Sequence, residues 1–302
     1  MQHKLTEWES FITYIGGSII QIILDNPITA YRQLIQQYAK DSTGNIIDPK
    51  IARQEANKVF IKLPVTTSLS GLTPRLLGAS IKSIPKFGSL WLVTALTNQN
   101  ENNKKEPTII AAISSSIFSA YIINPIRMIE KQQRVELKNT GKIKSMSAII
   151  EESYLFGNFK PLFRGTIPLM AHSAASATTG LIGQPKLQKI IQGKLSSSDS
   201  NSIFSFSKST ANLIASALVS PIYVVMTNPI SRLEVIMQTN PIRYPAIKLS
   251  DAINELLIDS KKFGLRGVFR GQGIGIGKAV VSLTLFHEGR MFCEHLILRN
   301  KL

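Results

Sequence analysis

The sequence predicts an all-α membrane protein with six transmembrane helices, arranged as three two-helix repeats with pseudo-threefold symmetry. Three features of the 302 residues lead to this prediction: long segments without charge, a Pro-to-Gly spacing that recurs three times, and alternating basic and neutral connections. A chain of this length can hold one large domain or two ordinary ones. Because the repeats follow one another without a break, we expect a single barrel over residues 1–302.

The charge-free segments are long enough to cross a bilayer. Residues 107–126, 165–185 and 209–231 contain no Asp, Glu, Lys or Arg, and a helix crosses the hydrocarbon core with roughly 20 residues. Residues 10–24 form a fourth such stretch, and residues 71–96 and 271–285 form two weaker ones with three and one basic residues. These six candidates place the repeats at about 10–98, 107–194 and 209–298.

The tripeptide Asn-Pro-Ile marks the same place in each repeat. It occurs at Pro27, Pro125 and Pro229, which are 98 and 104 residues apart. The glycines that open the following spans lie 44, 40 and 42 residues later, at Gly71, Gly165 and Gly271. Since proline removes a backbone donor and bends a helix, we expect three equivalent kinks that draw the odd-numbered helices together at one end.

The connections between spans alternate in charge. Segments 35–70, 133–163 and 235–269 each contain five basic and three acidic residues, whereas segments 98–107 and 195–209 are neutral. Basic connections normally face the negative side of an energised membrane. We therefore expect the three basic linkers on one side and both termini on the other. The first ten residues form no recognisable presequence, so any import signal is expected to be internal.

Composition also excludes several classes of protein. The net charge of +16 indicates an anionic partner such as nucleic acid, lipid or a solute. The bases are spread over three linkers without a reading motif, so we expect no nucleic acid. One cysteine and four histidines without ligand spacing predict no metal site. No nucleophile–base set or phosphate loop is present, so the chain is predicted to be no enzyme and to hold no cofactor.

On these features the chain resembles the mitochondrial carriers. That family has three repeats with P-x-[DE]-x-x-[KR] after one span and an aromatic-basic-Gly string before the next. Here "FGNFKPLFRG" and "FGLRGVFRG" precede Gly165 and Gly271, while the first repeat has the more degenerate "TTSLSG". The resemblance covers about residues 10–298. It implies a multi-pass barrel in the inner mitochondrial membrane, with a water-filled cavity and short matrix helices between odd and even spans.

The resemblance further implies a ring of three ion pairs at the matrix end, which this sequence largely lacks. The paired positions are Thr29 with Glu130, Arg127 with Glu234, and Ser231 with Arg32. Only Arg127 and Glu234 keep opposite charges, and their order is reversed. Asp25 lies one turn before Thr29 on the same face, so it could replace the missing acid or hydrate a cavity wall.

A second network is implied at the opposite end, as an aromatic-acid-x-x-base string on each even helix. The matching stretches are 89–96, 181–188 and 287–294, and only Glu288 and Arg290 are charged near the expected place. A cycling carrier must form and break both networks, because each stabilises one occluded state. The sequence therefore marks a degenerate member and argues against ordinary exchange transport.

The family's spacing places three substrate-contact positions at Gly78, at His172 with Ser173 beside it, and at Lys278. A lone cation within a membrane span marks a functional site by default, although Lys278 could instead anchor helix packing or meet a lipid phosphate. His172 and Ser173 could bind a carboxylate or phosphate, or His172 could be a hydrogen-bonded interior histidine. Because Gly78 adds no chemistry, any ligand should be small and singly or doubly negative.

Bound cardiolipin is also implied, at the glycines and arginines that precede the even helices. The candidates are Gly71, Arg164, Gly165, Arg270 and Gly271. Basic interfacial pockets suit this lipid, but the arginines could equally be ordinary residues of a basic connection.

Two functions from different classes remain. The first is a non-transporting accessory or structural component, bound to a larger respiratory or synthase assembly in the inner mitochondrial membrane. It is favoured by the loss of both ion-pair networks. The second is a functional carrier of a small anionic metabolite, which Lys278 and the residual charges at Arg127 and Glu234 would suit. In either case the expected partners are membrane lipids, including cardiolipin.

Overall fold

The chain is mostly helical. The computed structural model describes residues 6–40, 45–81, 109–178, 190, 208–242 and 244–299. Within these residues there is no strand, and only an isolated antiparallel bridge joins Lys40 to Ile46. The predicted all-α class is confirmed, while parts of the second and fourth expected spans, from residues 82 and 179 onward, lie outside the described residues.

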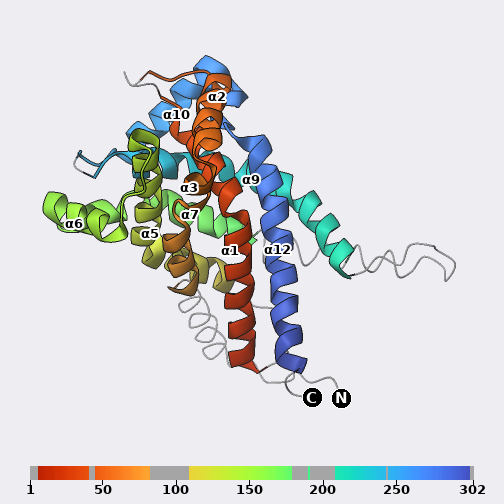
Figure 1. Cartoon of the computed structure of the whole chain (residues 1–302). Coiled ribbons are helices and arrows are strands. Elements are labelled where there is room, and N and C mark those ends of the chain that lie inside the picture. The colour runs from red at the N-terminus through yellow and green to blue at the C-terminus, as the bar shows by residue number, and fades with distance from the viewer. Residues whose placement is uncertain are drawn as a thin grey trace.

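The long helices are α1 (Glu7–Gln37), α5 (Ile109–Thr140), α9 (Lys208–Thr239) and α12 (Gln272–Arg299). The shorter elements are α2 (Pro49–Lys62), α3 (Pro64–Leu69), α6 (Met146–Gly157), η1 (Lys160–Phe163), α7 (Thr166–Ala177), α10 (Leu249–Phe263) and α11 (Leu265–Val268). Residues 72–81 are also helical. Figure 1 shows α1 beside α12, with α1 beginning and α12 ending at the bottom of the view, opposite α2 and α10.

Local signals account for where several helices begin. Thr6 and Glu9 form a capping box at the start of α1, which satisfies backbone donors that a helix start leaves free. Asp48 caps α2, which begins with Pro49, a residue preorganised for the first helical turn. Ser145 accepts a bond from the Ala148 amide at the start of α6. The basic linkers therefore fold into separate short helices.

The three Asn-Pro-Ile prolines lie inside long helices, as expected. Pro27 is in α1, Pro125 in α5 and Pro229 in α9, and each helix continues beyond its proline. Helices α1, α5 and α9 therefore tolerate the lost backbone donor. The segments of these helices after the prolines are positioned to meet one another.

Helices α1 and α12 approach closely along a glycine seam. A Cβ on Gly17 would lie 2.9 Å from the Arg290 amide nitrogen, and one on Gly289 would lie 3.2 Å from Cα of Gly17. Small residues allow such backbone contact between helices. The glycine pair at 16–17 thus allows the close approach of α1 and α12.

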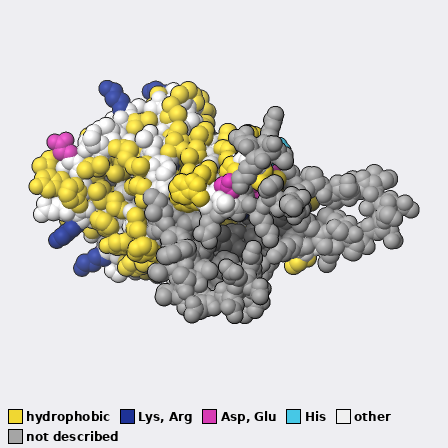
Figure 2. Space-filling view, turned by 90° about the horizontal axis from the view of Figure 1, so that it is seen from below, with side chains coloured by type: hydrophobic (Ala, Val, Ile, Leu, Met, Phe, Trp, Pro, Cys, Tyr) yellow, Lys and Arg dark blue, Asp and Glu magenta, His cyan; other side chains and the backbone are white. Residues whose placement is uncertain are grey.

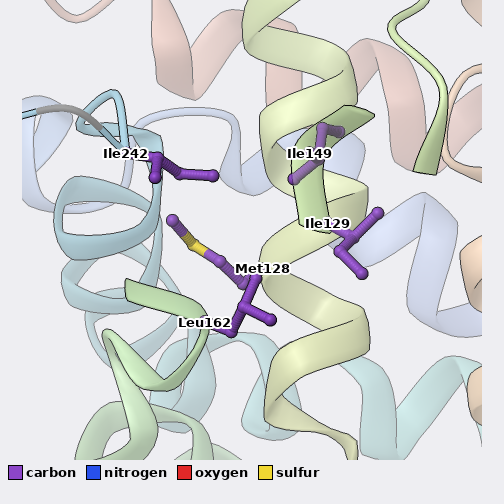
Figure 3. Close-up of a cluster of buried hydrophobic side chains, with 5 residues drawn as sticks. All are labelled: Met128, Ile129, Ile149, Leu162 and Ile242. Atoms are coloured by element: carbon purple, nitrogen blue, oxygen red, sulfur yellow. The ribbon is translucent and has the colours of Figure 1, made fainter. Parts of the chain in front are cut away.

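A small apolar cluster ties the second linker to the bundle. Met128 and Ile129 of α5 pack with Ile149 of α6, Leu162 of η1 and Ile242 in the segment after α9 (Figure 3). Each of these side chains is buried. The cluster therefore joins segments that are far apart in the sequence at the end of α5 beyond its proline.

Elsewhere the usual distribution of side chains is reversed. The long helices expose Trp8, Ile23, Leu24, Phe118, Tyr121, Leu218, Ile222 and Phe292. Three of these helices, α1, α5 and α9, bury Asp25, Asn26, Asn124, Glu130, Arg134, Asn228, Arg232 and Glu234. Figure 2 shows apolar side chains over much of the described part of one face, with Lys and Arg at its edge. Large exposed apolar surfaces mark contact with a membrane or with another protein.

Two helices of the described part are long and apolar enough to cross a membrane. They are Trp8–Gln37 and Leu213–Thr239, with mean hydropathies of 1.2 and 1.6 in their most apolar windows. A soluble core helix or a signal sequence can satisfy the same test, but only 22% and 35% of these windows are buried. Of the six spans expected, this criterion identifies two, and the six-span architecture is taken up below as a proposal.

Replacing Gly17 tests the glycine seam. Gly17→Ala should lower the midpoint of thermal unfolding in detergent, because the added methyl group would lie 2.9 Å from the Arg290 nitrogen. Overpacking of this kind costs about 1–3 kcal/mol. Gly273→Ala in α12 is the matched control, since a Cβ there meets nothing within 4 Å. Equal midpoints for the two variants would contradict the seam.

Candidate functional site in the bundle interior

The asparagine before each kink proline makes the same contact. Each side-chain amide donates to backbone carbonyls just ahead of the next helix that begins with a glycine. The equivalent bonds go to the carbonyl three residues before the glycine: Asn26 to Ser68, Asn124 to Leu162 (3.3 Å) and Asn228 to Val268 (3.4 Å). An unpaired buried carbonyl is costly, so these asparagines stabilise the sharp corners between linker and helix.

The backbone conformation favours glycine at each corner, and crowding adds a second reason at Gly71 and Gly165. Gly71, Gly165 and Gly271 have φ of +69°, +70° and +77°, a region that side chains disfavour. Each also faces a side chain of another long helix. The neighbours of a Cβ would be Glu130 (2.8 Å) at Gly71, Gln238 (3.0 Å) at Gly165 and Arg32 (3.7 Å) at Gly271. The corners are thus places where the helices beyond the kinks press against the chain.

The expected Arg127–Glu234 pair is wrong. Arg127 Nη1 lies 3.6 Å from Glu130 Oε2 on its own helix, whereas Glu234 Oε1 lies 3.7 Å from Lys131 Nζ. Lys131 is one residue after position 130, where the carrier motif counted from Pro125 would have its base. The link between α5 and α9 therefore uses a cation one helical turn after Arg127. Spacing alone could not distinguish the two cations, because four residues apart on a helix they lie on the same face.

The other two expected gate pairs do not form either. In the described residues, Thr29 makes no hydrogen bond to Glu130, and its buried hydroxyl has no partner. Ser231 makes none to Arg32, whose Nη2 instead donates to Asn228 at 2.6 Å. The acid-to-serine and acid-to-threonine replacements therefore remove these links, and Arg32 bonds one turn closer to the kink.

Polar contacts nevertheless join α1, α5 and α9, the three long helices that contain a kink proline, beyond those prolines. Gln33 of α1 donates to Glu130 of α5 at 3.4 Å, and Arg134 binds both of them. Lys131 pairs with Glu234 between α5 and α9, and the Arg32–Asn228 bond joins α1 to α9. These six residues and Arg134 are called the polar ring below. One interhelical ion pair and several hydrogen bonds thus replace the implied three ion pairs.

Arg134 anchors the polar ring to the backbone. Its guanidinium is fully buried, lies 2.6 Å from Glu130 Oε1 and donates to the Ser70 carbonyl at 3.2 Å. Gln238, at the same distance from its proline, donates to the Arg164 carbonyl at 3.1 Å. Separating the segments here would leave the donors of Arg134 and Gln238 without their carbonyl partners, and each buried unpaired group costs about 1–3 kcal/mol. Neither residue was predicted from the sequence, although both lie nine residues after a kink proline.

Asp25 neither replaces the missing acid nor hydrates an open wall. It is buried, and Oδ1 lies 2.7 Å from Nη2 of Arg75. Ser282 of α12 also donates to it, and Arg75 donates to Asn26 at 2.7 Å. Arg75 is one turn after Gly71, the only cation within residues 72–81, which is the signal that could have identified this pair.

The three expected substrate-contact positions face different long helices. Gly78 lies against Ile126 of α5, because a Cβ added to this glycine would be 3.5 Å from Cγ2 of Ile126. The His172 ring is 6.4 Å from the Tyr223 ring of α9, and Ser173 is buried. Lys278 is in α12 and, within the described residues, forms no ion pair shorter than 4.0 Å. Gly78 and His172 therefore lie against α5 and α9, and Lys278 is a cation whose neighbouring acid, Asp25, is already paired with Arg75.

The two arginines considered for lipid binding are bound to protein instead. Arg164 donates to the carbonyls of Pro241 (3.1 Å) and Ile242 (3.0 Å), among others. Arg270 donates to Ile47 (2.9 Å) and pairs with Asp259 (3.1 Å). Burial lowers the pKa of both guanidinium groups, and for Arg270 it outweighs the nearby Asp259 carboxylate. Both arginines clamp the connections that follow α9 and α1.

The network expected at the opposite end falls mostly outside the described residues. Segments 89–96 and 181–188 are not described, and 287–294 belongs to α12. In the described chain no group of three or more His, Cys, Asp or Glu residues could hold a metal ion. The polar groups of the interior can bind charge, orient a small polar ligand or fix the helices.

No protein-family model matches this chain, and no curated protein matches its sequence.

A pair of double-mutant cycles tests the partner of Glu234. Lys131→Ala and Glu234→Ala should show a coupling of about 0.5–3 kcal/mol in thermal or denaturant unfolding, because the two side chains are in direct contact. The cycle of Arg127→Ala with Glu234→Ala should show a smaller coupling. A larger coupling in the second cycle would restore the pairing expected from the sequence.

Proposed function

We propose that the chain is a non-transporting accessory protein with a six-helix, carrier-type barrel, held within a larger assembly of the inner mitochondrial membrane. The observation that carries the membrane part of this proposal is the reversed placement of side chains. Large apolar residues are exposed on α1, α5, α9 and α12, while α1, α5 and α9 bury Asp25, Arg32, Glu130, Lys131, Arg134, Arg232 and Glu234. Water would favour the opposite arrangement, whereas lipid favours this one.

The threefold recurrence of one corner supports the barrel. Three kink prolines, the asparagines before them and three glycines with positive φ stand in the same relation to one another. In each case the helix that faces the glycine belongs to the next repeat in cyclic order. A closed arrangement of three equivalent units accounts for this order, and an open row of helices does not.

The polar ring supports an accessory role over transport. Alternating access needs two closed states of similar free energy, so that a ligand can shift the balance. Here Arg134, Gln238 and the corner asparagines bind backbone carbonyls as well as one another. These contacts stabilise the state in which the helices meet beyond their prolines. The chain would then rest with that end closed.

A second function, carriage of a small anionic metabolite, is favoured by one observation. Lys278 lies near Asp25 and Arg75, which already pair with each other at 2.7 Å. A small anion could therefore neutralise Lys278. In an accessory protein, the same lysine would serve helix packing, lipid or a trapped anion.

Topology is tested by labelling introduced cysteines. Lys50→Cys, Lys142→Cys and Lys248→Cys, each in a Cys293→Ser background, should all react with an impermeant thiol reagent from the same side of sealed vesicles. The physical reason is that the three basic linkers share one side of the membrane. A cysteine at the start of α1 should react only from the other side. A split among the three linkers would rule out the six-helix repeat architecture.

Reconstitution separates the two functions. Wild type and Lys278→Ala are placed in liposomes and assayed with a panel of small mono- and dianions, beside a carrier of known activity. We expect no uptake by either form, because the polar ring holds one end closed. Native electrophoresis of mildly solubilised membranes should show wild type well above its own 33.3 kDa. Robust uptake that Lys278→Ala abolishes would establish the carrier function instead.

A further inference from the structure

Helix α6 lacks the basic residues that the other two linker helices contain. It contains Glu151 and Glu152 and no Lys or Arg. By contrast α2 contains four basic residues, and α10 ends with Lys261 and Lys262. Glu152 pairs with Lys144 at 2.6 Å, whereas Glu151 is exposed. Helices that lie on anionic lipid usually present Lys and Arg at their polar face, and α6 has none to present.

The same helix exposes a large aromatic and aliphatic surface. Only Ile149 and Ser153 of α6 are buried. The exposed residues, called the α6 face below, are Ile150 (38%), Tyr154 (56%), Leu155 (70%), Phe156 (59%) and, just after the helix, Phe159 (44%). Figure 1 shows α6 projecting from the side of the bundle. Burying such aromatic side chains is the main source of affinity in protein interfaces.

In the described residues, the α5–α6 connection has no arginine that holds it as Arg164 and Arg270 hold the connections after α9 and α1. Arg164 binds the segment after α9, and Arg270 binds the segment after α1. The residue at the same place in the first repeat is Ser70, whose carbonyl is taken by Asn26 and Arg134. The α5–α6 connection is instead held by Gln133 of α5, which donates to the Lys144 carbonyl at 2.9 Å. A partner could therefore bind α6 without disturbing the polar ring.

We propose that the α6 face is a docking surface for a protein subunit that presents an apolar groove with a basic rim. The groove would receive Tyr154, Leu155 and Phe156, and a basic residue of the rim would pair with Glu151. An amphipathic helix that lies in an apolar groove is a common mode of recognition. The proposal rests on the proposed accessory function and identifies where the assembly is contacted. The competing occupant, an anionic membrane surface, suits α6 poorly because the helix is acidic.

Position 61 of α2 provides a matched control. Ile61 and Leu155 are each ten residues before the glycine of their corner, and both are highly exposed, at 78% and 70%. A photoreactive benzoylphenylalanine is placed at either position, and intact mitochondrial membranes are irradiated. We expect a discrete protein adduct from position 155 and none from position 61.

Substitutions then measure the contribution of the face. Leu155→Glu should shift most of the chain from the large assembly to the free form in native electrophoresis. Ile61→Glu should leave it in the assembly. Glu151→Lys should also release it, because the rim is basic. All three positions are exposed, so the thermal midpoints of the purified variants should match that of wild type.

The outcomes separate the two proposals. Lipid adducts alone from position 155, equal release by Leu155→Glu and Ile61→Glu, or retention of Leu155→Glu in the assembly would each overturn the docking face. None of these results would contradict the accessory role, provided that wild type migrates in a large assembly. If wild type migrates alone, the accessory role itself fails.

Discussion

Charge buried among helices must be paired inside the protein, and the interior of this bundle is organised around that requirement. Glu130 is fully buried and has Arg134 at 2.6 Å, with Arg127 more distant at 3.6 Å. Asp25 has Arg75, and Asp259 has two arginines. Removing one partner of such a pair costs about 3–5 kcal/mol. The Glu130 pairs lie within α5, whereas the Asp25 and Asp259 pairs join different segments of the chain and oppose their separation.

The pairs also connect side chains to the backbone corners. A proline frees a backbone carbonyl in each of α1, α5 and α9. A glycine in a left-handed conformation then opens the helix that follows each linker. Asn124 and Gln238 bond to each other and to the Arg164 carbonyl, so one contact spans three segments. Links around the other corners also share residues: Arg134 contacts Glu130, Gln33 and the Ser70 carbonyl, and Asn228 joins Arg32 to the Val268 carbonyl. Such coupling suits a fixed scaffold better than a gate that must open repeatedly.

The expected repeats are unequal, and the differences lie mainly in the first and second. The first lacks the arginine that precedes the glycine in the others, and it has the buried pair of Asp25 with Arg75 instead. The second has an acidic linker helix with an exposed aromatic surface. Transport by a threefold barrel depends on equivalent networks in the three repeats. Unequal repeats are what we expect where selection acts on attachment to a partner.

The sequence by itself predicted the helical class and the three prolines inside long helices, while the separate linker helices were implied by the resemblance to the carriers. The helical class follows from the length of the charge-free segments, and the kinks follow from the missing proline donor. It did not determine which charged groups pair. Arg127 and Lys131 are four residues apart on one face of α5, and only the rotation and tilt of α9 bring Glu234 to Lys131. Pairing depends on distances of a few ångströms between helices far apart in the chain, so only the tertiary structure could decide it.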